Sequence, residues 1–338
     1  MSSLDAHPFA RLMPWPPYSK DRLCGDIETF LAYGDMGAED LGEFLNTAEA
    51  QDVVVLYTAT ENELYAFSRW LDTRAPQNRP HLVANVTLPS FFQAGSTSPN
   101  LRGQLLRTAI RRVMQQMPDE RRVFITLTDK MAIALEAITG VNFDVTANPV
   151  DLLAGGNAST SVQQTGPVKV ACPGQPKGTK GAGILPEIIE KASDLNCLFR
   201  VQNWPADSSA APNVELLPTT MDRPEYVAYL QSCEITLLPY DTDFYALAVS
   251  AIFDEVASLG HGVVTTTGTW MANCIDDGGV VGRHAPDGDV DGLVAALHHL
   301  VDNMTDLRKN ADENAKTWCA RRGVRSYMDH VFVRLGID

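Results

Sequence analysis

The feature that most constrains the fold is a regular alternation between short apolar runs and amphipathic segments. DVVVLYTA (52–59), HLVANVTLP (81–89) and RRVFITLTD (121–129) are apolar runs of strand length. Each is followed by a segment with apolar residues at helical spacing, such as ENELYAFSRWLDT (61–73). Because strands that are apolar throughout are buried on both faces, the pattern predicts an α/β fold with a parallel sheet covered by helices.

One stretch of small and polar residues, LLAGGNASTSVQQTG (152–166), interrupts this alternation and is predicted to link two domains. A second series begins after it with VKVACPG (168–174) and ends with VDGLVAALHHLVDN (290–303). We therefore predict two Rossmann-like domains, residues 1–160 and 161–310, with a ligand in the crevice at the carboxyl ends of the strands. A helical tail over 311–338 is expected to follow. The first helix of the chain is expected at AEDLGEFLNTAEAQ (38–51).

Charge and cysteine usage exclude several classes of protein. The formal net charge of −15 argues against nucleic acid as a partner, because nucleic acid requires a basic face. No apolar run approaches the ~20 residues that a transmembrane helix needs, and the first residues lack the apolar core of a signal peptide. The six cysteines are scattered without metal-type spacing, so we expect reduced thiols and a cytoplasmic protein. No cluster of ligands predicts a metal.

The first candidate site is CPGQPKGTKGAG (172–183), which lies between a predicted strand and a predicted helix. From residue 152 to residue 186 the chain has three lysines and no carboxylate. Glycines such as Gly174 let the backbone approach a ligand closely, and Lys177 and Lys180 would act as point charges on a phosphate. The loop matches neither dinucleotide fingerprint. A solvated Gly/Lys loop explains the residues equally well.

The second candidate is LLPYDTDFYALAVSAIFDEVASLG (237–260), a buried strand, a polar loop and a helix. Ser250 stands where a helix N-cap is expected, so the amides that follow it would face a phosphate or a sugar oxygen. Glu255 lies in the second turn, where a solvent-facing glutamate is the more common interpretation.

The third candidate is VVTTTGTWM (263–271), an apolar strand that ends in hydroxyl residues. These hydroxyls and amides would line a crevice. For Trp270 and Met271, however, a place in the core is the favoured interpretation.

Together these segments resemble the C-terminal domain of retaining, family-4-like GT-B glycosyltransferases. That family reads G-R-x(3–5)-K-G, then N-V-x-[FL]-x-G, A-D-[IV]-x-[LV]-x-P and finally E-G-F-G-x(4)-E-A-x-A-x-G-x-P-V-V. This chain has PGQPKGTKG, NVELLPT, SCEITLLPY and FYALAVSAIFDEVASLGHGVVTT in the same order. The resemblance spans residues 165–300, about half of the chain, and the first half shares only the alternation of strands and helices. It implies the GT-B fold, in which two Rossmann-like domains face a cleft and the C-terminal tail crosses back to the first domain.

The resemblance also implies a role for each matching residue. Lys177 and Lys180 would hold the donor diphosphate and stabilise its developing charge, which is the catalytic contribution such a transfer needs. Glu255 would hold the ribose hydroxyls of the donor. The remaining residues of the implied donor site are Gly174, Ser250 and Ala251, whose backbone faces the phosphate, Thr219 beside the nucleobase, and Tyr245.

The chain also departs from the family pattern. Leu247 stands where the family has the first glutamate of its pair, and Tyr245 begins the segment that replaces Gly-Phe-Gly. The first half has no Gly-Gly loop for an acceptor and no convincing catalytic histidine. Its candidate loop, AYGDMGAED (32–40), has isolated glycines only. The departures bear on contacts with the donor sugar, on acceptor binding and on turnover.

The expected function is transfer of a sugar from a nucleoside diphosphate sugar to a glycan, lipid-linked or small-molecule acceptor, with retention, in carbohydrate biosynthesis. No cofactor or metal is required if lysines stabilise the diphosphate. A peripheral contact with a membrane stays compatible with this function. The alternatives are a degenerate GT-B protein that binds a nucleotide or glycan without turnover, and a nucleotide-sugar epimerase of GT-B shape.

Overall fold

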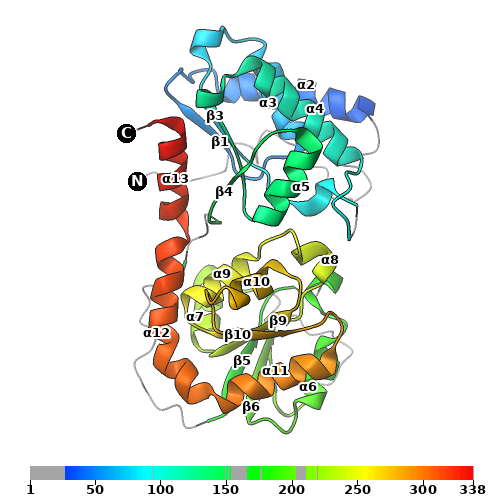
Figure 1. Cartoon of the computed structure of the whole chain (residues 1–338), viewed down its shortest axis with the longest axis vertical. Helices are drawn as coiled ribbons and strands as arrows, with labels where there is room; N and C mark the ends of the chain where they lie inside the picture. The colour runs from blue at the N-terminus through cyan, green and yellow to red at the C-terminus, as the bar shows by residue number, and fades with distance from the viewer. Residues whose placement is uncertain are drawn as a thin grey trace. The chain divides into compact units, whose positions relative to one another are not determined.

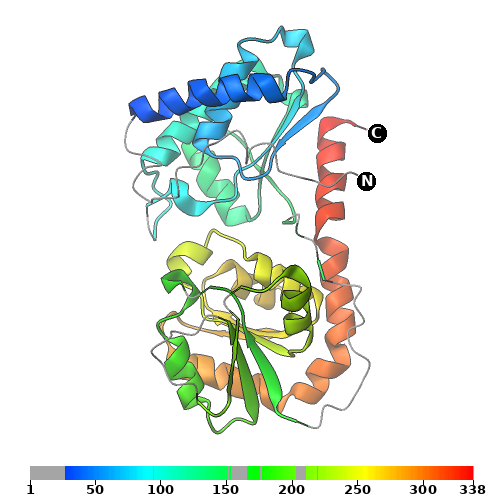
Figure 2. The same cartoon turned by 180° about the vertical axis from the view of Figure 1, so that it is seen from behind.

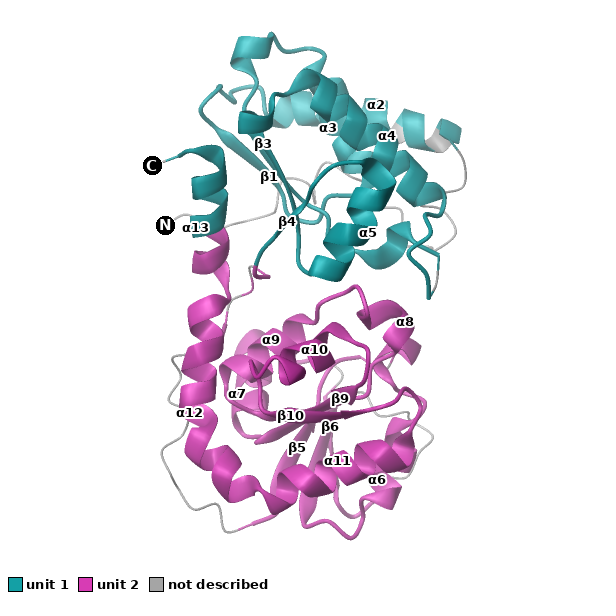
Figure 3. Cartoon of the chain, viewed as in Figure 1, with its two compact units in different colours: residues 1–146, 329–338 teal, residues 147–328 magenta. Residues whose placement is uncertain are grey.

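The computed structural model describes residues 27–337, except 94, 149, 151, 154–165, 176, 203–210 and 219. The chain divides into two compact units (Figure 3). One unit contains Met1–Thr146 and Asp329–Asp338, and the other contains Ala147–Met328. The predicted boundary at residue 160 falls among residues outside the described part of the chain, whereas this division follows Thr146.

The first unit is built on a four-stranded parallel sheet with the strand order β1-β2-β3-β4 (Figure 1). Right-handed crossovers that all run in one direction place successive helices on the same face of a sheet. Accordingly α3 packs on α4, and α4 packs on α5. The elements are α2 (Ile27–Phe44), β1 (Val53–Leu56), α3 (Glu61–Leu71), β2 (His81–Asn85), α4 (Leu101–Gln116), β3 (Arg122–Thr126), α5 (Asp129–Thr139) and β4 (Asp144–Val145).

The long helix α2 packs on α3 and runs across the outside of the helix layer in the view of Figure 2. Two of its glycines make this contact close. A Cβ at Gly34 would lie 2.0 Å from Cδ1 of Tyr65, and a Cβ at Gly37 would lie 2.9 Å from Cβ of Ala66. The segment 32–40, considered above as an acceptor loop, is therefore part of a helix whose glycines serve packing.

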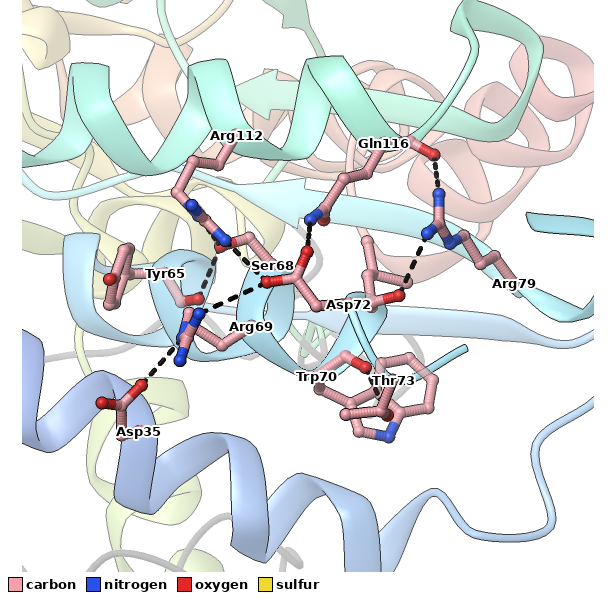
Figure 4. A network of polar contacts seen from close by, with 11 residues as sticks. Asp35, Tyr65, Ser68, Arg69, Trp70, Asp72, Thr73, Arg79, Arg112 and Gln116 are labelled. Atoms are coloured by element: carbon pink, nitrogen blue, oxygen red, sulfur yellow. Dashed lines mark hydrogen bonds and ion pairs between the residues drawn. The ribbon is translucent and has the colours of Figure 1, made fainter. Parts of the chain in front are cut away.

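Polar side chains join α2, α3 and α4 in a network (Figure 4). The carboxylate of Asp72 accepts hydrogen bonds from Arg112, at 2.7 Å, and from Gln116. Arg69 donates to Asp35 at 2.8 Å and lies 3.5 Å from Asp72. These arginines are paired with carboxylates of neighbouring helices, so their charges support helix packing in this unit.

The second unit is built on a six-stranded parallel sheet with the order β10-β9-β8-β5-β6-β7. Its elements are β5 (Val168–Cys172), α6 (Leu185–Lys191), β6 (Cys197–Gln202), β7 (Val214–Leu217), α7 (Arg223–Gln231), β8 (Ile235–Leu238), α8 (Thr242–Tyr245), α9 (Ala251–Ser258), β9 (Gly262–Thr266), α10 (Trp270–Asp276), β10 (Gly282–Ala285) and α11 (Val290–Asp302). The chain runs outward from β5 in both directions, so the strand order reverses between β5 and β8. Val170 pairs with Ile235 at this reversal. In open α/β sheets the ligand binds outside the carboxyl ends of the strands at such a switch point.

The core of the second unit has two layers, one on each face of the sheet. On one face, alternate residues of β5 pack with α6 and α11. On the other face, Ala171 packs with residues of α7, α9 and α10 and with Trp318. The central strands β8 and β9 are buried at every residue, as their apolar sequences predict, whereas β6 and β7 at one side of the sheet are only partly buried.

The C-terminal residues form α12 (Met304–Arg321) and α13 (Val324–Leu335). Helix α12 packs on α9 within the second unit. Helix α13 passes the division between the units, and its last part belongs to the first unit. There His330 Nε2 lies 3.2 Å from a carboxylate oxygen of Asp144, which Arg334 also contacts. Of the helices in the described ranges, none combines the length and apolar character needed to cross a membrane.

Candidate functional site

The loop after β5 meets the first turn of α9 at the switch point of the second unit. Gly174 has φ +93°, and its N–H donates to Oε1 of Gln202 at the end of β6, at 3.0 Å. A Cβ at Gly174 would lie 3.0 Å from Nζ of Lys180 and 3.1 Å from Cδ1 of Ile252. The structure thus brings together Gly174, Lys180 and the helix that carries Ser250 and Glu255.

Lys180 presents a half-buried ammonium group at this place. It ends a short 3₁₀ turn, Gly178–Lys180, and its Nζ lies 5.6 Å from the centre of the Tyr240 ring. Burial lowers the pKa of Lys180, and the nearby charge of Lys177 lowers it further. Within the described ranges, no carboxylate pairs with either lysine. An anion that approaches this loop would therefore meet two cations that no carboxylate of those ranges neutralises.

The same loop rests on the segment that follows β8. Gly181 has φ +72°, and a Cβ there would lie 2.1 Å from the carbonyl oxygen of Pro239. The N–H of Asp241 donates to the carbonyl oxygen of Thr179 at 3.0 Å. Only glycine fits at position 181, because a side chain would clash with the backbone and the left-handed conformation is costly for other residues. This contact fixes Lys180 relative to the loop that leads to α9.

Helix α9 begins as the sequence predicts. Ser250 is its N-cap, with an extended backbone, and its Oγ accepts a hydrogen bond from the N–H of Phe253 at 3.3 Å. Ser250 is buried, and Ala251 is exposed at the first helical position. The cap uses the Phe253 amide, and the amides of Ala251 and Ile252 precede it in the same turn.

Glu255 is buried, with 8% of its surface exposed, so the solvent-facing interpretation of this residue is wrong. Arg223 Nη1 lies 2.5 Å from its Oε1, and the Tyr226 hydroxyl donates to its Oε2 at 3.1 Å. Both partners come from the first turns of α7. Burial and the Glu255 charge raise the pKa of Tyr226, so the hydroxyl stays protonated and remains a donor.

The residue before Glu255 is a second buried carboxyl, which the sequence analysis did not single out. Asp254 is fully buried, and Asn148 Nδ2 donates to its Oδ2 at 3.2 Å. Its Oδ1 has no hydrogen-bond partner within the described ranges. Burial raises the pKa of Asp254 to about 7, although the nearby charge of Arg322 opposes this shift. A signal was present in the sequence, since an aspartate follows AIF in an apolar helix.

Of the other expected site residues, Tyr245 makes no hydrogen bond or ring contact with Gly174, Lys180 or Glu255 within the described ranges. Tyr245 is buried, its ring packs 4.5 Å from that of Tyr240, and burial raises its pKa to about 12. Leu247 is also buried, so the position of the missing glutamate is apolar. Thr219 lies outside the described residues.

The third candidate segment, residues 263–271, contributes hydrogen bonds, a helix cap and buried side chains to the fold of the second unit. Thr265 Oγ1 donates to the Leu238 carbonyl at 2.9 Å, and Thr269 caps α10. Trp270 and Met271 are buried in the core, as predicted for these two residues. Within the described part of the chain, no group of three or more His, Cys, Asp or Glu residues could hold a metal ion.

In the first unit, Glu61 and Arg102 form a buried ion pair near the carboxyl end of β1. Glu61 is fully buried, and Arg102 donates to both of its carboxylate oxygens, at 2.6 and 2.9 Å. Arg102 also lies over the ring of Phe91. No sequence motif indicates this pair, because its two residues lie on different helices, 41 positions apart.

No family model matches the sequence, and no curated protein matches it. Solved structures do match. Trehalose-6-phosphate synthase from Burkholderia multivorans has a TM-score of 0.65 and 11% identity, over 92% of this chain and 75% of that chain. Anabaena Alr3699/HepE in complex with UDP and glucose has a TM-score of 0.63 and 15% identity, over 88% and 81%. Sucrose-phosphate synthase from Thermosynechococcus elongatus has a TM-score of 0.63 and 11% identity, over 96% and 82%.

These neighbours are GT-B glycosyltransferases, and the chain has their fold. The predicted α/β class with two Rossmann-like sheets is confirmed. Because the sequence identities are only 11–15%, these matches show a shared fold alone.

Proposed function

We propose that this chain transfers a sugar from a nucleoside diphosphate sugar to a saccharide or other hydroxyl acceptor, with retention. The observation that carries the proposal is the pair Lys177 and Lys180 at the switch point of the second unit. These cations lack a carboxylate partner within the described ranges, and Lys180 lies beside the start of α9. The complex of the Anabaena neighbour with UDP and glucose supports a nucleotide sugar as donor.

In this proposal the residues bind and polarise the donor. Lys180 and Lys177 would contact the diphosphate, and the amides of Ala251 and Ile252 would face it at the start of α9. The bond between the sugar anomeric carbon and the diphosphate oxygen breaks, and the acceptor oxygen attacks the same face. The acceptor proton passes to the leaving diphosphate. Lysines placed where negative charge develops stabilise the transition state without a metal or a protein nucleophile.

The test is release of nucleoside diphosphate. Purified protein is incubated with UDP- and GDP-sugars, with and without simple saccharide acceptors, and free UDP or GDP is measured. We expect release that increases with acceptor and falls in Lys180→Ala. Lys309→Ala removes the same charge from an exposed position on α12 and serves as the control. Equal rates in both variants would contradict the proposal.

A second candidate is binding without turnover, and the observation that favours it is Leu247. A buried leucine replaces the carboxylate that the resembling family places near the donor sugar. Tight binding of UDP or GDP with no release from any nucleotide sugar would support this candidate. Interconversion of free nucleotide sugars would instead identify an epimerase. The proposed compartment is the cytoplasm, and a lipid-linked acceptor at a membrane surface remains part of the proposal.

A further inference from the structure

The half-buried ammonium group of Lys180 has a partner that carries no charge. Its Nζ lies 5.6 Å from the centre of the Tyr240 ring, and no carboxylate of the described ranges forms an ion pair with it. A cation over an aromatic ring is attracted by the negative face of that ring, and the attraction increases where water is excluded. The ring therefore offsets part of the cost of burying this ammonium group.

Tyr240 is a rigid and neutral partner. It has 1% of its surface exposed, and its ring packs 4.5 Å from the ring of Tyr245. Burial raises the pKa of Tyr240, so the hydroxyl stays protonated and the side chain does not become an anion. A carboxylate at this place would neutralise Lys180. A neutral ring attracts the ammonium group and leaves its full charge for a phosphate.

The backbone fixes the lysine and the tyrosine relative to each other. The residues on either side of Lys180 contact the residues on either side of Tyr240. These contacts are the hydrogen bond from the Asp241 N–H to the Thr179 carbonyl oxygen, at 3.0 Å, and the close approach of Gly181 to Pro239. Because β5 and β8 are neighbours at the reversal of strand order, the pair lies where open α/β sheets bind their ligands.

The side chain of Lys180 is also restricted along its length. A Cβ at Gly174 would lie 3.0 Å from its Nζ and 3.8 Å from its Cδ, so the lysine occupies the space that a side chain at position 174 would fill. A free lysine side chain populates many rotamers, and fixing it on binding reduces affinity. Gly174 and the Tyr240 ring limit these rotamers before a ligand arrives.

We propose that Tyr240 is the positioning residue for Lys180: its ring holds the ammonium group at the switch point by cation–π attraction and leaves the charge for a phosphate of the ligand. This inference rests on the proposed function, in which Lys180 contacts the donor diphosphate. A tyrosine that only fills the core would affect binding through the fold, whatever residue stands at position 180. A tyrosine that positions the lysine acts only when the lysine is present.

The experiment measures the affinity for pyrophosphate by calorimetry in a double-mutant cycle. Tyr240→Leu removes the ring, and we expect pyrophosphate to bind about three- to tenfold more weakly. Tyr240→Phe keeps the face of the ring and should bind pyrophosphate within about twofold of the wild type. In Lys180→Ala, which lacks the cation, adding Tyr240→Leu should cause no further loss. In Lys177→Ala the same addition should cause the full loss.

Tyr229→Leu is the matched control. Tyr229 is another buried tyrosine of the second unit with a cation over its ring, since the Arg200 guanidinium lies 5.6 Å from the ring centre. Arg200 is paired with Glu215 at 2.7 Å, and it has no role in the proposed site. The control removes the same kind of ring from the same core, so pyrophosphate affinity should stay at the wild-type value.

Three results of this cycle would overturn the inference. The first is an equal loss of affinity in Tyr229→Leu and Tyr240→Leu. The second is the same loss from Tyr240→Leu whether or not Lys180 is present. The third is a Tyr240→Phe variant that binds as weakly as Tyr240→Leu. Each would show that the ring at position 240 acts through the fold alone.

A second series keeps an aromatic ring in the core. Phenylalanines with one, two or three ring fluorines at position 240 retain the ring while fluorine withdraws electron density from its face, which weakens the attraction for a cation. Pyrophosphate affinity should fall stepwise with the number of fluorines. Affinity that does not depend on fluorination would overturn the inference, even where Tyr240→Leu does not fold.

Two further results separate this inference from the proposed function. If substitutions at Tyr240 leave pyrophosphate affinity unchanged, while Lys180→Ala weakens it and nucleotide sugars still release UDP or GDP, the inference is wrong and the proposed function stands. If Lys180→Ala binds pyrophosphate as tightly as the wild type, the proposed contact of Lys180 with the diphosphate fails, and the inference fails with it.

Discussion

At the scale of single residues, the proposed donor site combines charges with and without partners. The lysines of the loop after β5 have no carboxylate partner within the described ranges, whereas Glu255 is buried and has Arg223 and Tyr226 as partners. The lysines are therefore free to bind a ligand phosphate. Glu255 is restrained, so it can select a ligand by geometry. We therefore expect substitutions of the unpaired lysines and of the paired Glu255 to affect ligand binding differently.

The lysines should act through charge. Replacing Lys180 or Lys177 by Ala removes a charge-assisted contact worth ~1.5–3 kcal/mol, or about one to two decades in affinity for a nucleoside diphosphate. Pyrophosphate should lose affinity by a similar factor, because the contact is to phosphate. Calorimetric titration with both ligands tests this, with Lys309→Ala as the control. Unchanged affinity in both single variants would refute the role.

Glu255 should act through the ribose. Glu255→Gln keeps a good helix former in α9 and loses the ionised acceptor, so UDP or GDP should bind roughly tenfold more weakly, a loss of ~1.5 kcal/mol. Pyrophosphate, which has no ribose, should bind as before. An equal loss for pyrophosphate would mean that Glu255 acts through its general electrostatic field.

Asp254 should make stability depend on pH. Its pKa is raised from 3.8 to about 7, so the folded state binds a proton more tightly than the unfolded state between these values. The free energy of unfolding should therefore fall as pH rises from about 4 to about 7, by up to ~1.4 kcal/mol per pH unit, and this contribution should level off above. In Asp254→Asn the side chain at position 254 does not titrate, so this pH-dependent contribution to the free energy of unfolding is absent.

Denaturant unfolding of both proteins at pH 5 and pH 8 checks this. The stability of Asp254→Asn relative to wild type should be higher at pH 8 than at pH 5. The same difference at both pH values would show that Asp254 keeps an ordinary pKa.

At the scale of elements, the contact between the loops after β5 and β8 is the part of the site that the sequence could not define. Gly181→Ala would place a Cβ 2.1 Å from a backbone oxygen in a left-handed conformation, so the loop must move. We expect weaker binding of pyrophosphate and UDP together, because Lys180 is displaced. Gly183→Ala is the matched control, since nothing lies within 4 Å of a Cβ there and its φ is not positive. Equal binding in both variants would contradict the role of this contact.

Much of the element pattern was predictable because it depends on local periodicity. The apolar runs form β1, β2, β3 and β5 where expected, and the cap at Ser250 begins α9. The predicted helix over 38–51 was wrong in its bounds, since α2 spans Ile27–Phe44. Gly34 and Gly37 lower the helix propensity of this segment, so the sequence alone does not predict a helix there. The close packing of these glycines against α3 stabilises the helix, and no local sequence signal reveals that contact.

The partners of the buried charges were not predictable either, because they lie far away in the sequence and meet only through tertiary packing. Glu255 meets Arg223 and Tyr226, which lie 32 and 29 positions before it, and Asp254 meets Asn148, 106 positions before it. The sequence identified the glutamate and the lysines as candidates. It could not show which candidates were neutralised, because that depends on how α7 and α9 pack.

At the scale of the whole molecule, each unit has its own sheet and core, and the proposed donor residues all belong to the second unit. Ligand binding to the folded state stabilises the part of the protein that carries the site. UDP or GDP at about 100 times its Kd should add roughly 2.7 kcal/mol. We therefore expect hydrogen exchange to slow in the second unit, at the loop after β5 and in α7 and α9, and to stay unchanged in β1–β3 of the first unit. Hydrogen-exchange mass spectrometry with and without nucleotide measures this, with Lys180→Ala at the same ligand concentration as the control. Protection confined to the first unit would place the nucleotide elsewhere and contradict the assignment of the donor site to the second.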